Sequence, residues 1–292
     1  MGWTRLRSPF IAALAAQRGN IVILRYLIII AVFVTPLAQA DIVLLGDNAR
    51  LQLLNECGAP CSAGSYKITS PKLNAKASEV ASLAKDASHA VIVVDATQGP
   101  LPVTREHVLI ARQAGIPSLS IMFANVSGLE GMKDAGELLE LEELEVREVF
   151  NMYEMGGDNA PVYHDSGIKV VPNLYSNAIG LNSVLSKLKA TPKRKEFNVK
   201  YFTGKTLNTY VYLLTPQEAK HTLTLNQGIS VELWVNGQVA KGKVASKGIT
   251  PGGNGELQII LDSPVKAAEG SRYLLENNGQ IIAAGVVVRV SS

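Results

Sequence analysis

The spacing of hydrophobic positions changes once along this chain. Between Asp41 and His164, short runs of β-branched residues alternate with longer amphipathic stretches, as strands and helices do in an α/β domain. Beyond Tyr201 the apolar residues recur at every second position, which is typical of half-buried antiparallel strands. The pattern predicts a doubly wound, mostly parallel α/β domain followed by a small antiparallel β-barrel or sandwich.

The clearest βαβ unit of the first domain spans residues 90–123. Ala90–Val94 predicts a buried parallel strand, which Gly99-Pro100 ends. A helix is expected over residues 103–114, and Gly115-Ile116-Pro117 separates it from a strand over 118–123. Further strands are expected at 41–45 and 162–164, and further helices at 49–57, 75–87, 137–150 and 181–188.

The second domain is predicted from four runs of alternating residues. Turn sequences rich in Asn and Gly separate these runs, as in β-hairpins. The runs are 209–214, 229–234, 255–261 and 283–290. The predicted organisation is a leader over 1–40, an α/β domain over 41–190, a basic linker over 191–200 and a barrel domain over 201–292.

The leader resembles an export signal in its charge and hydropathy. An apolar run over Tyr26–Leu37 follows the arginines and precedes Ala38-Gln39-Ala40, the small-x-small pattern of a signal-peptidase site. This run is shorter than the roughly 20 residues that span a membrane. We expect cleavage after Ala40 and a periplasmic or secreted protein with no membrane span. An uncleaved anchor, a misassigned start codon, and a core strand of a cytoplasmic protein are the alternatives.

Net charge argues against a polyanionic partner. The leader holds four arginines and no acidic residue, namely Arg5, Arg7, Arg18 and Arg25. Without them, 24 basic residues face 25 acidic ones, a net charge of −1. The body of the chain therefore has no overall attraction for nucleic acid or anionic membrane, and we expect no nucleic-acid partner.

The two cysteines, Cys57 and Cys61, lie four positions apart just after the leader. In an exported protein, such a pair predicts a disulfide that closes a small loop. Two unpaired thiols are the alternative. A metal site is not expected, since no His or second Cys pair lies near in sequence.

Three stretches resemble elongation factor Tu, a translation-factor GTPase. Residues 93–117, which include Thr104-Arg105-Glu106-His107, resemble the central unit of its GTP-binding domain, and 136–150 resembles the next helix. Residues 271–287 resemble part of its last barrel domain. The resemblance extends over 41–292 and implies a GTPase-like domain joined to that barrel. The family's middle domain has no room here.

The motifs that bind phosphate and Mg²⁺ in this family are absent. A phosphate loop G-x-x-x-x-G-K-[ST] counted from Gly46 would place its second Gly, Lys and Ser/Thr at Leu51, Gln52 and Leu53. No Lys occurs between Asp41 and Tyr66. Thr69 stands where the metal-linked Asp belongs, and Leu73 where the water-positioning His belongs.

The base-reading motif Asn-Lys-x-Asp is retained only in its first residue. Asn125 is kept, whereas Val126 and Gly128 replace the Lys and the Asp. Ser166 echoes a short base-contacting loop of the family. The remnant cofactor positions are therefore Gly46, Asn125 and Ser166, and no catalytic residue is expected. His107 has no visible nucleophile or carboxylate partner, which predicts a structural role.

These observations lead to three functional hypotheses. The first is a degenerate elongation factor Tu-like protein that does not hydrolyse GTP, binds no cofactor, and acts as an interaction scaffold for an unknown protein in the cell envelope. The second is a divergent elongation factor that binds GTP and Mg²⁺ and delivers aminoacyl-tRNA to the ribosome. The third is a gene remnant without a selected function.

Overall fold

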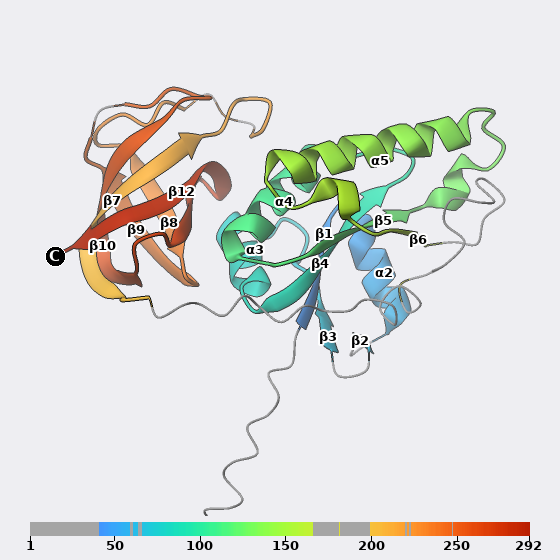
Figure 1. Cartoon of the computed structure of the whole chain (residues 1–292), viewed down its shortest axis with the longest axis horizontal. Helices are drawn as coiled ribbons and strands as arrows, with labels where there is room; N and C mark the ends of the chain where they lie inside the picture. Colours follow the sequence, from blue (N-terminus) through green and yellow to red (C-terminus); the bar gives the residue numbers. More distant parts are fainter. Residues whose placement is uncertain are drawn as a thin grey trace, which may run out of the picture. The chain divides into compact units, whose positions relative to one another are not determined.

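The computed structural model describes residues 41–58, 61–63, 66–165, 181, 199–219, 221, 223–246 and 248–292 (Figure 1). The expected leader, Ser166, and most of the expected helix at 181–188 lie outside these residues, as do linker residues 191–198. None of the helices in the described part is both long and apolar enough to cross a membrane.

The first domain is built on a sheet whose order is β2-β3-β1-β4-β5-β6. Its five parallel strands are β1 (Asp41–Gly46), β3 (Tyr66–Thr69), β4 (Ala87–Asp95), β5 (Leu119–Ala124) and β6 (Val162–His164). The short β2 (Ser62–Ala63) pairs antiparallel with β3. Because the chain runs outward from β1 to β3 and from β4 to β6, its topological switch point lies between β1 and β4.

Helices cover both faces of this sheet, as expected for a doubly wound fold (Figure 1). The helices α3 (Ala77–Ala84), α4 (Pro102–Ala114) and α5 (Ala135–Met152) share one apolar cluster with β1, β4 and β5. The helix α2 (Ala49–Cys57) packs in a second cluster on the other face. Short 3₁₀ turns lie at Val126–Leu129 and Gly157–Asn159.

Local sequence explains where α4 begins and ends. Pro102 occupies the first turn, where its missing N–H costs no hydrogen bond. Gly115 is left-handed (φ +79°) and its N–H donates to the carbonyls of Ala111 and Arg112. The predicted helix over 103–114 is thus confirmed to within one residue.

The expected helix over 75–87 is wrong at both ends. The helix α3 begins at Ala77, after a cap in which the Glu79 side chain accepts from the Lys76 N–H, and it ends at Ala84. Ala87 instead begins β4, where it pairs with Asp41 of β1. Alanine favours a helix in isolation, but Ala87 begins a strand that is buried inside the sheet. Pairing between strands therefore overrides the local preference for a helix.

The second domain is a closed antiparallel barrel of order β10-β7-β12-β11-β8-β9, which decides against the sandwich. Its strands are β7 (Phe202–Leu213), β8 (Ser230–Val235), β9 (Gln238–Val244), β10 (Asn254–Ala267), β11 (Arg272–Asn277) and β12 (Gln280–Ser291). The alternation pattern missed β9 and β11. Both adjoin tight Asn-Gly turns, at Asn236-Gly237 and Asn278-Gly279, whose residues all have positive φ.

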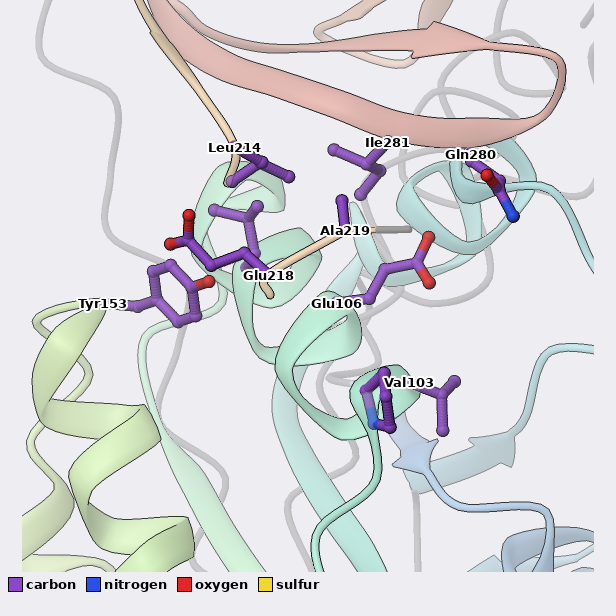
Figure 2. A pocket seen from close by; sticks show the side chains of 10 residues that line it. Val103, Glu106, Tyr153, Leu214, Glu218, Ala219, Gln280 and Ile281 are labelled. Atoms are coloured by element: carbon purple, nitrogen blue, oxygen red, sulfur yellow. The ribbon is translucent and has the colours of Figure 1, made fainter. Parts of the chain in front are cut away.

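The barrel packs against α3 and α4 through polar and apolar contacts. Gln113 Nε2 donates to the carbonyl of Tyr273 (3.1 Å), and Trp234 Nε1 donates to Ser82 Oγ (3.1 Å). Trp234 also belongs to the apolar cluster of α3 and α4. Between α4, the segment 214–219 and the start of β12 lies a cavity of about 170 Å³. Glu106 and Glu218 are among its lining side chains (Figure 2).

Candidate functional site

The carboxyl ends of β1, β4 and β5 meet at one edge of the parallel sheet. Ligands of doubly wound proteins bind at this edge, beside the switch point. Gly46 ends β1 and Asn125 follows β5, so the structure places two of the three predicted remnant positions at this edge. The third, Ser166, lies outside the described residues.

Gly46 is required by the close approach of β1 to β4. It has φ +89°, and a Cβ atom here would lie 2.2 Å from the Val93 carbonyl oxygen. The N–H of Asp47 donates to that same carbonyl (2.8 Å). A glycine at this position is therefore explained by the backbone turn alone, without a bound phosphate.

His107 reaches from α4 to the end of β1. Its Nδ1 accepts a hydrogen bond from the Gly46 N–H at 2.8 Å, so this nitrogen carries no proton. The ring is buried. Burial, reinforced by the positive charge of Arg50, lowers the pKa of His107 to about 3. His107 is thus a neutral structural acceptor.

Arg50, in the first turn of α2, is also buried. Its Nη1 donates to the Gly46 carbonyl (3.0 Å) and to Asn48 Oδ1 (2.9 Å), while Nη2 donates to the Pro71 carbonyl (3.3 Å). Burial lowers the pKa of Arg50, and the nearby Asp47 carboxylate opposes that shift. The guanidinium thus binds the turn after β1 to the segment after β3.

A phosphate loop works by presenting free backbone N–H groups to the ligand. In the turn after β1, five of these N–H groups already have acceptors inside the chain. Gly46 donates to His107, Asp47 to Val93, and Ala49 to the Asp47 carboxylate (3.0 Å). The N–H groups of Arg50 and Leu51 donate to the carbonyls of Asp47 and Asn48. The buried Asp47 carboxylate would also repel a phosphate, so these residues do not fit a nucleotide.

Asp95, at the end of β4, organises the neighbouring loop. Its carboxylate accepts from Thr97 N (2.9 Å), Thr97 Oγ1 (2.7 Å), Asn125 Nδ2 (2.7 Å) and Gln98 Nε2 (3.3 Å). Burial alone would raise the pKa of Asp95, but the hydrogen bonds from Thr97, Asn125 and Gln98 together outweigh it and lower the pKa. Asp95 is an ionised anchor for this loop.

Asn125 holds the loop after β5 through its backbone as well as through its side-chain bond to Asp95. It adopts a left-handed conformation (φ 58°), which Asn tolerates better than most residues, and its N–H donates to Asp165 Oδ2 (2.6 Å). Val126 is buried in the core, and a Cβ at Gly128 would lie 2.7 Å from Thr97 Cγ2. In this conformation, Val126 therefore takes part in core packing, and a side chain at position 128 would collide with Thr97.

Glu142 is a buried carboxyl group that the sequence did not reveal. It projects from α5 and is 5% exposed, and its Oε2 has no hydrogen-bond partner in the described part of the chain. Burial, with the charges of Glu145 and Asp95, raises the pKa of Glu142 to about 7. Asp47 and Arg50 were also missed. Only Asp47, two residues before α2, carries a recognisable capping signal.

The cysteines lie at the other end of α2 from Asp47. Cys57, the last residue of this helix, forms a disulfide with Cys61, whose carbonyl accepts from the Ile68 N–H (3.1 Å). The bond joins the end of α2 to the β2–β3 hairpin. Among the described residues, no group of three or more His, Cys, Asp or Glu side chains is placed to hold a metal ion.

Residues 77–194 match the sequence model of the elongation factor Tu GTP binding domain. This match, together with a parallel sheet followed by a six-stranded antiparallel barrel, supports a translation-factor-like GTPase family with a C-terminal barrel domain. The resemblance to elongation factor Tu is therefore confirmed. The matched residues begin after the turn at Gly46 and after the segment Thr69–Leu73.

His107→Gln should flatten the acid dependence of stability. The folded protein keeps His107 neutral down to about pH 3, whereas the unfolded chain takes up a proton below its ordinary pKa of 6.5. The stability from this group is present above pH 6.5 and declines as the pH falls toward 3. Between pH 7 and pH 5, the free energy of unfolding of the wild type should fall by about 2 kcal/mol more than that of the variant. Urea unfolding at both pH values measures this. Equal losses would contradict the assignment.

Glu142→Gln should have the opposite pH signature. The pKa of Glu142 is raised from 4.5 to about 7 in the folded protein, so its contribution is present below pH 4.5 and is lost as the pH rises through 7. Near pH 4, the variant and the wild type should have the same unfolding midpoint. At pH 8, the unfolding midpoint of the variant should be the higher of the two. Glu140→Gln, at an exposed position of the same helix, is the matched control and should change neither value.

Proposed function

We propose that this protein is a degenerate relative of elongation factor Tu that does not hydrolyse GTP and acts as a protein-interaction scaffold in the cell envelope. The observation that carries the proposal is the turn after β1. Its N–H groups are bonded to His107, Val93 and Asp47 where a GTPase would bind phosphate.

Substitutions at the positions of the family's phosphate-binding, metal-linked and water-positioning residues support the same proposal. The turn holds no Lys to neutralise a terminal phosphate. Thr69 has replaced the metal-linked Asp, and the exposed Leu73 cannot orient a water molecule. Each change alone would weaken GTP hydrolysis, and together they leave no group for its chemical step.

The proposed location rests on the leader and the cysteines. The leader has a basic stretch, an apolar run and the Ala38-Gln39-Ala40 pattern of an export signal. Disulfides persist in oxidising compartments and are rare in the cytosol. The Cys57–Cys61 bond is therefore in keeping with a protein of the envelope.

An exposed surface of α5 supports the scaffold role. Leu141, Leu144 and Met152 are 55%, 64% and 50% exposed. They lie among exposed glutamates of the same helix, namely Glu137, Glu140, Glu145 and Glu148. An apolar stripe with a charged border is typical of a protein-binding surface. We propose that a protein partner binds here.

The match to the family's GTP binding domain favours one alternative. A divergent elongation factor would bind GTP and Mg²⁺ and deliver aminoacyl-tRNA. It would need a phosphate site built from residues other than those of the turn after β1.

Fluorescent GTP and GDP, with and without Mg²⁺, should show no saturable binding to the full chain up to millimolar nucleotide. An active elongation factor Tu is the positive control. Asp47→Ala removes the repelling carboxylate and frees the Ala49 N–H. This variant therefore tests whether the turn can bind phosphate once both obstacles are removed. It should still not bind, because no Lys is present. Micromolar, guanine-specific binding by either protein would establish the alternative.

Native protein from cells should carry oxidised Cys57 and Cys61 and begin at Asp41. Alkylation with a maleimide before and after reduction reports the thiols, and mass spectrometry of the intact protein reports the terminus. Cys57→Ser/Cys61→Ser is the control that shows no alkylation in either state. Free thiols on a chain that retains its leader would contradict the envelope location.

A further inference from the structure

One side of the barrel combines lysines with exposed apolar side chains. This lysine face covers three neighbouring strands, β9, β10 and β7. It consists of Val239, Lys241 and Lys243 on β9, Ile260, Asp262 and Lys266 on β10, and Lys205 on β7. Val239 and Ile260 are 45% and 50% exposed.

Strand register places these side chains on one continuous surface. On β9 the residues Ala240, Gly242 and Val244 are buried, so the alternate positions point outward. Ile260 lies opposite Lys243 on β9 and opposite Thr206 on β7. Lys266 lies opposite Thr203 further along the same pair of strands. The apolar groups are thus interleaved with ammonium groups.

The positive charge of this face is only partly balanced by neighbouring carboxylates. Across the described part of the chain, the side-chain ion pairs are Arg112–Glu154 and Arg147–Glu143, and neither involves the face. Lys205 Nζ donates to the backbone carbonyl of Asp262 (2.9 Å) rather than to a carboxylate. Glu232, opposite Lys241, and the exposed Asp262 bring two carboxylates to this face, against its four lysines.

Two aromatic rings beside this face are each covered by a lysine. Lys200 Nζ lies 5.1 Å from the centroid of the Phe202 ring, and Lys266 Nζ lies 5.4 Å from that of Tyr201. Nucleic-acid surfaces use such rings to stack bases. Here an ammonium group already covers each ring, as suits a membrane interface, where aromatic rings and long lysine side chains gather at headgroup level.

We propose that the lysine face docks this protein on an anionic phospholipid surface. The lysines contact headgroup phosphates, and Val239 and Ile260 enter the boundary between headgroups and acyl chains. Because the attraction is local, it operates despite the net charge of −1 outside the leader. The inference rests on the proposed envelope role, since it names the surface on which the scaffold would act.

Co-sedimentation of the full chain with vesicles tests this docking. Wild type should bind vesicles of phosphatidylcholine with phosphatidylglycerol, and not vesicles of phosphatidylcholine alone. Lys241→Glu/Lys243→Glu should lower the partition coefficient by about tenfold or more, because each lysine near an anionic surface contributes about fivefold. Raising the salt to about 0.5 M should weaken binding by shortening the Debye length.

Lys72→Glu/Lys133→Glu makes the same change of charge at exposed positions of the α/β domain. It carries the same leader and should bind like the wild type. Ile260→Ser should weaken binding at every salt concentration. Equal binding by both double variants, equal binding to uncharged vesicles, or binding of single-stranded RNA in place of vesicles would overturn the proposal.

The two proposals fail in distinguishable ways. Absent vesicle binding with absent nucleotide binding would overturn the lipid surface and leave the scaffold role in place. Guanine-specific binding together with salt-sensitive vesicle binding would overturn the scaffold role. The proposal that the lysine face binds anionic phospholipid would then still stand.

Discussion

The hydrogen bond from the Gly46 N–H to His107 is the contact on which the candidate site depends. It fixes the end of β1 against α4 inside the protein, where an unsatisfied N–H would cost about 1–3 kcal/mol. With Gly46 held in this way, its carbonyl faces Arg50, and Arg50 in turn reaches Pro71 after β3. The imidazole, the Val93 carbonyl and the Arg50 guanidinium together therefore hold the turn after β1.

The same helix also supports the barrel, so packing by itself constrains part of the Thr-Arg-Glu-His signature. His107 points to the sheet, whereas Glu106 accepts a hydrogen bond from the Ile281 backbone of β12. Burial raises the pKa of Glu106, and that hydrogen bond opposes the shift. Two turns further on, Gln113 and Arg112 contact β11. The fold alone is enough to constrain these positions.

The sequence predicted the elements whose signals are local and missed those that depend on packing. The helix α4 has both a proline start and a glycine stop, and the buried runs of β1 and β4 are unmistakable. The β3–β1–β4 register, by contrast, decides that Ala87 is in a strand. The strand β9 was not predicted because its inward positions include Ala240 and Gly242. These small residues give little hydrophobic alternation against Lys241 and Lys243.

The sequence shows that the turn after β1 carries no phosphate-loop Lys, but it does not show which internal groups hold that turn. Arg50 and His107 are 57 positions apart, and only the fold brings both to Gly46. A domain of this kind is ordinarily stabilised by its ligand, by about 2.7 kcal/mol at one hundred times the dissociation constant. Two or three internal hydrogen bonds at about 1 kcal/mol each supply a similar amount. The turn after β1 can therefore be ordered without nucleotide, because the chain provides its own partners for the groups that a phosphate would have bound.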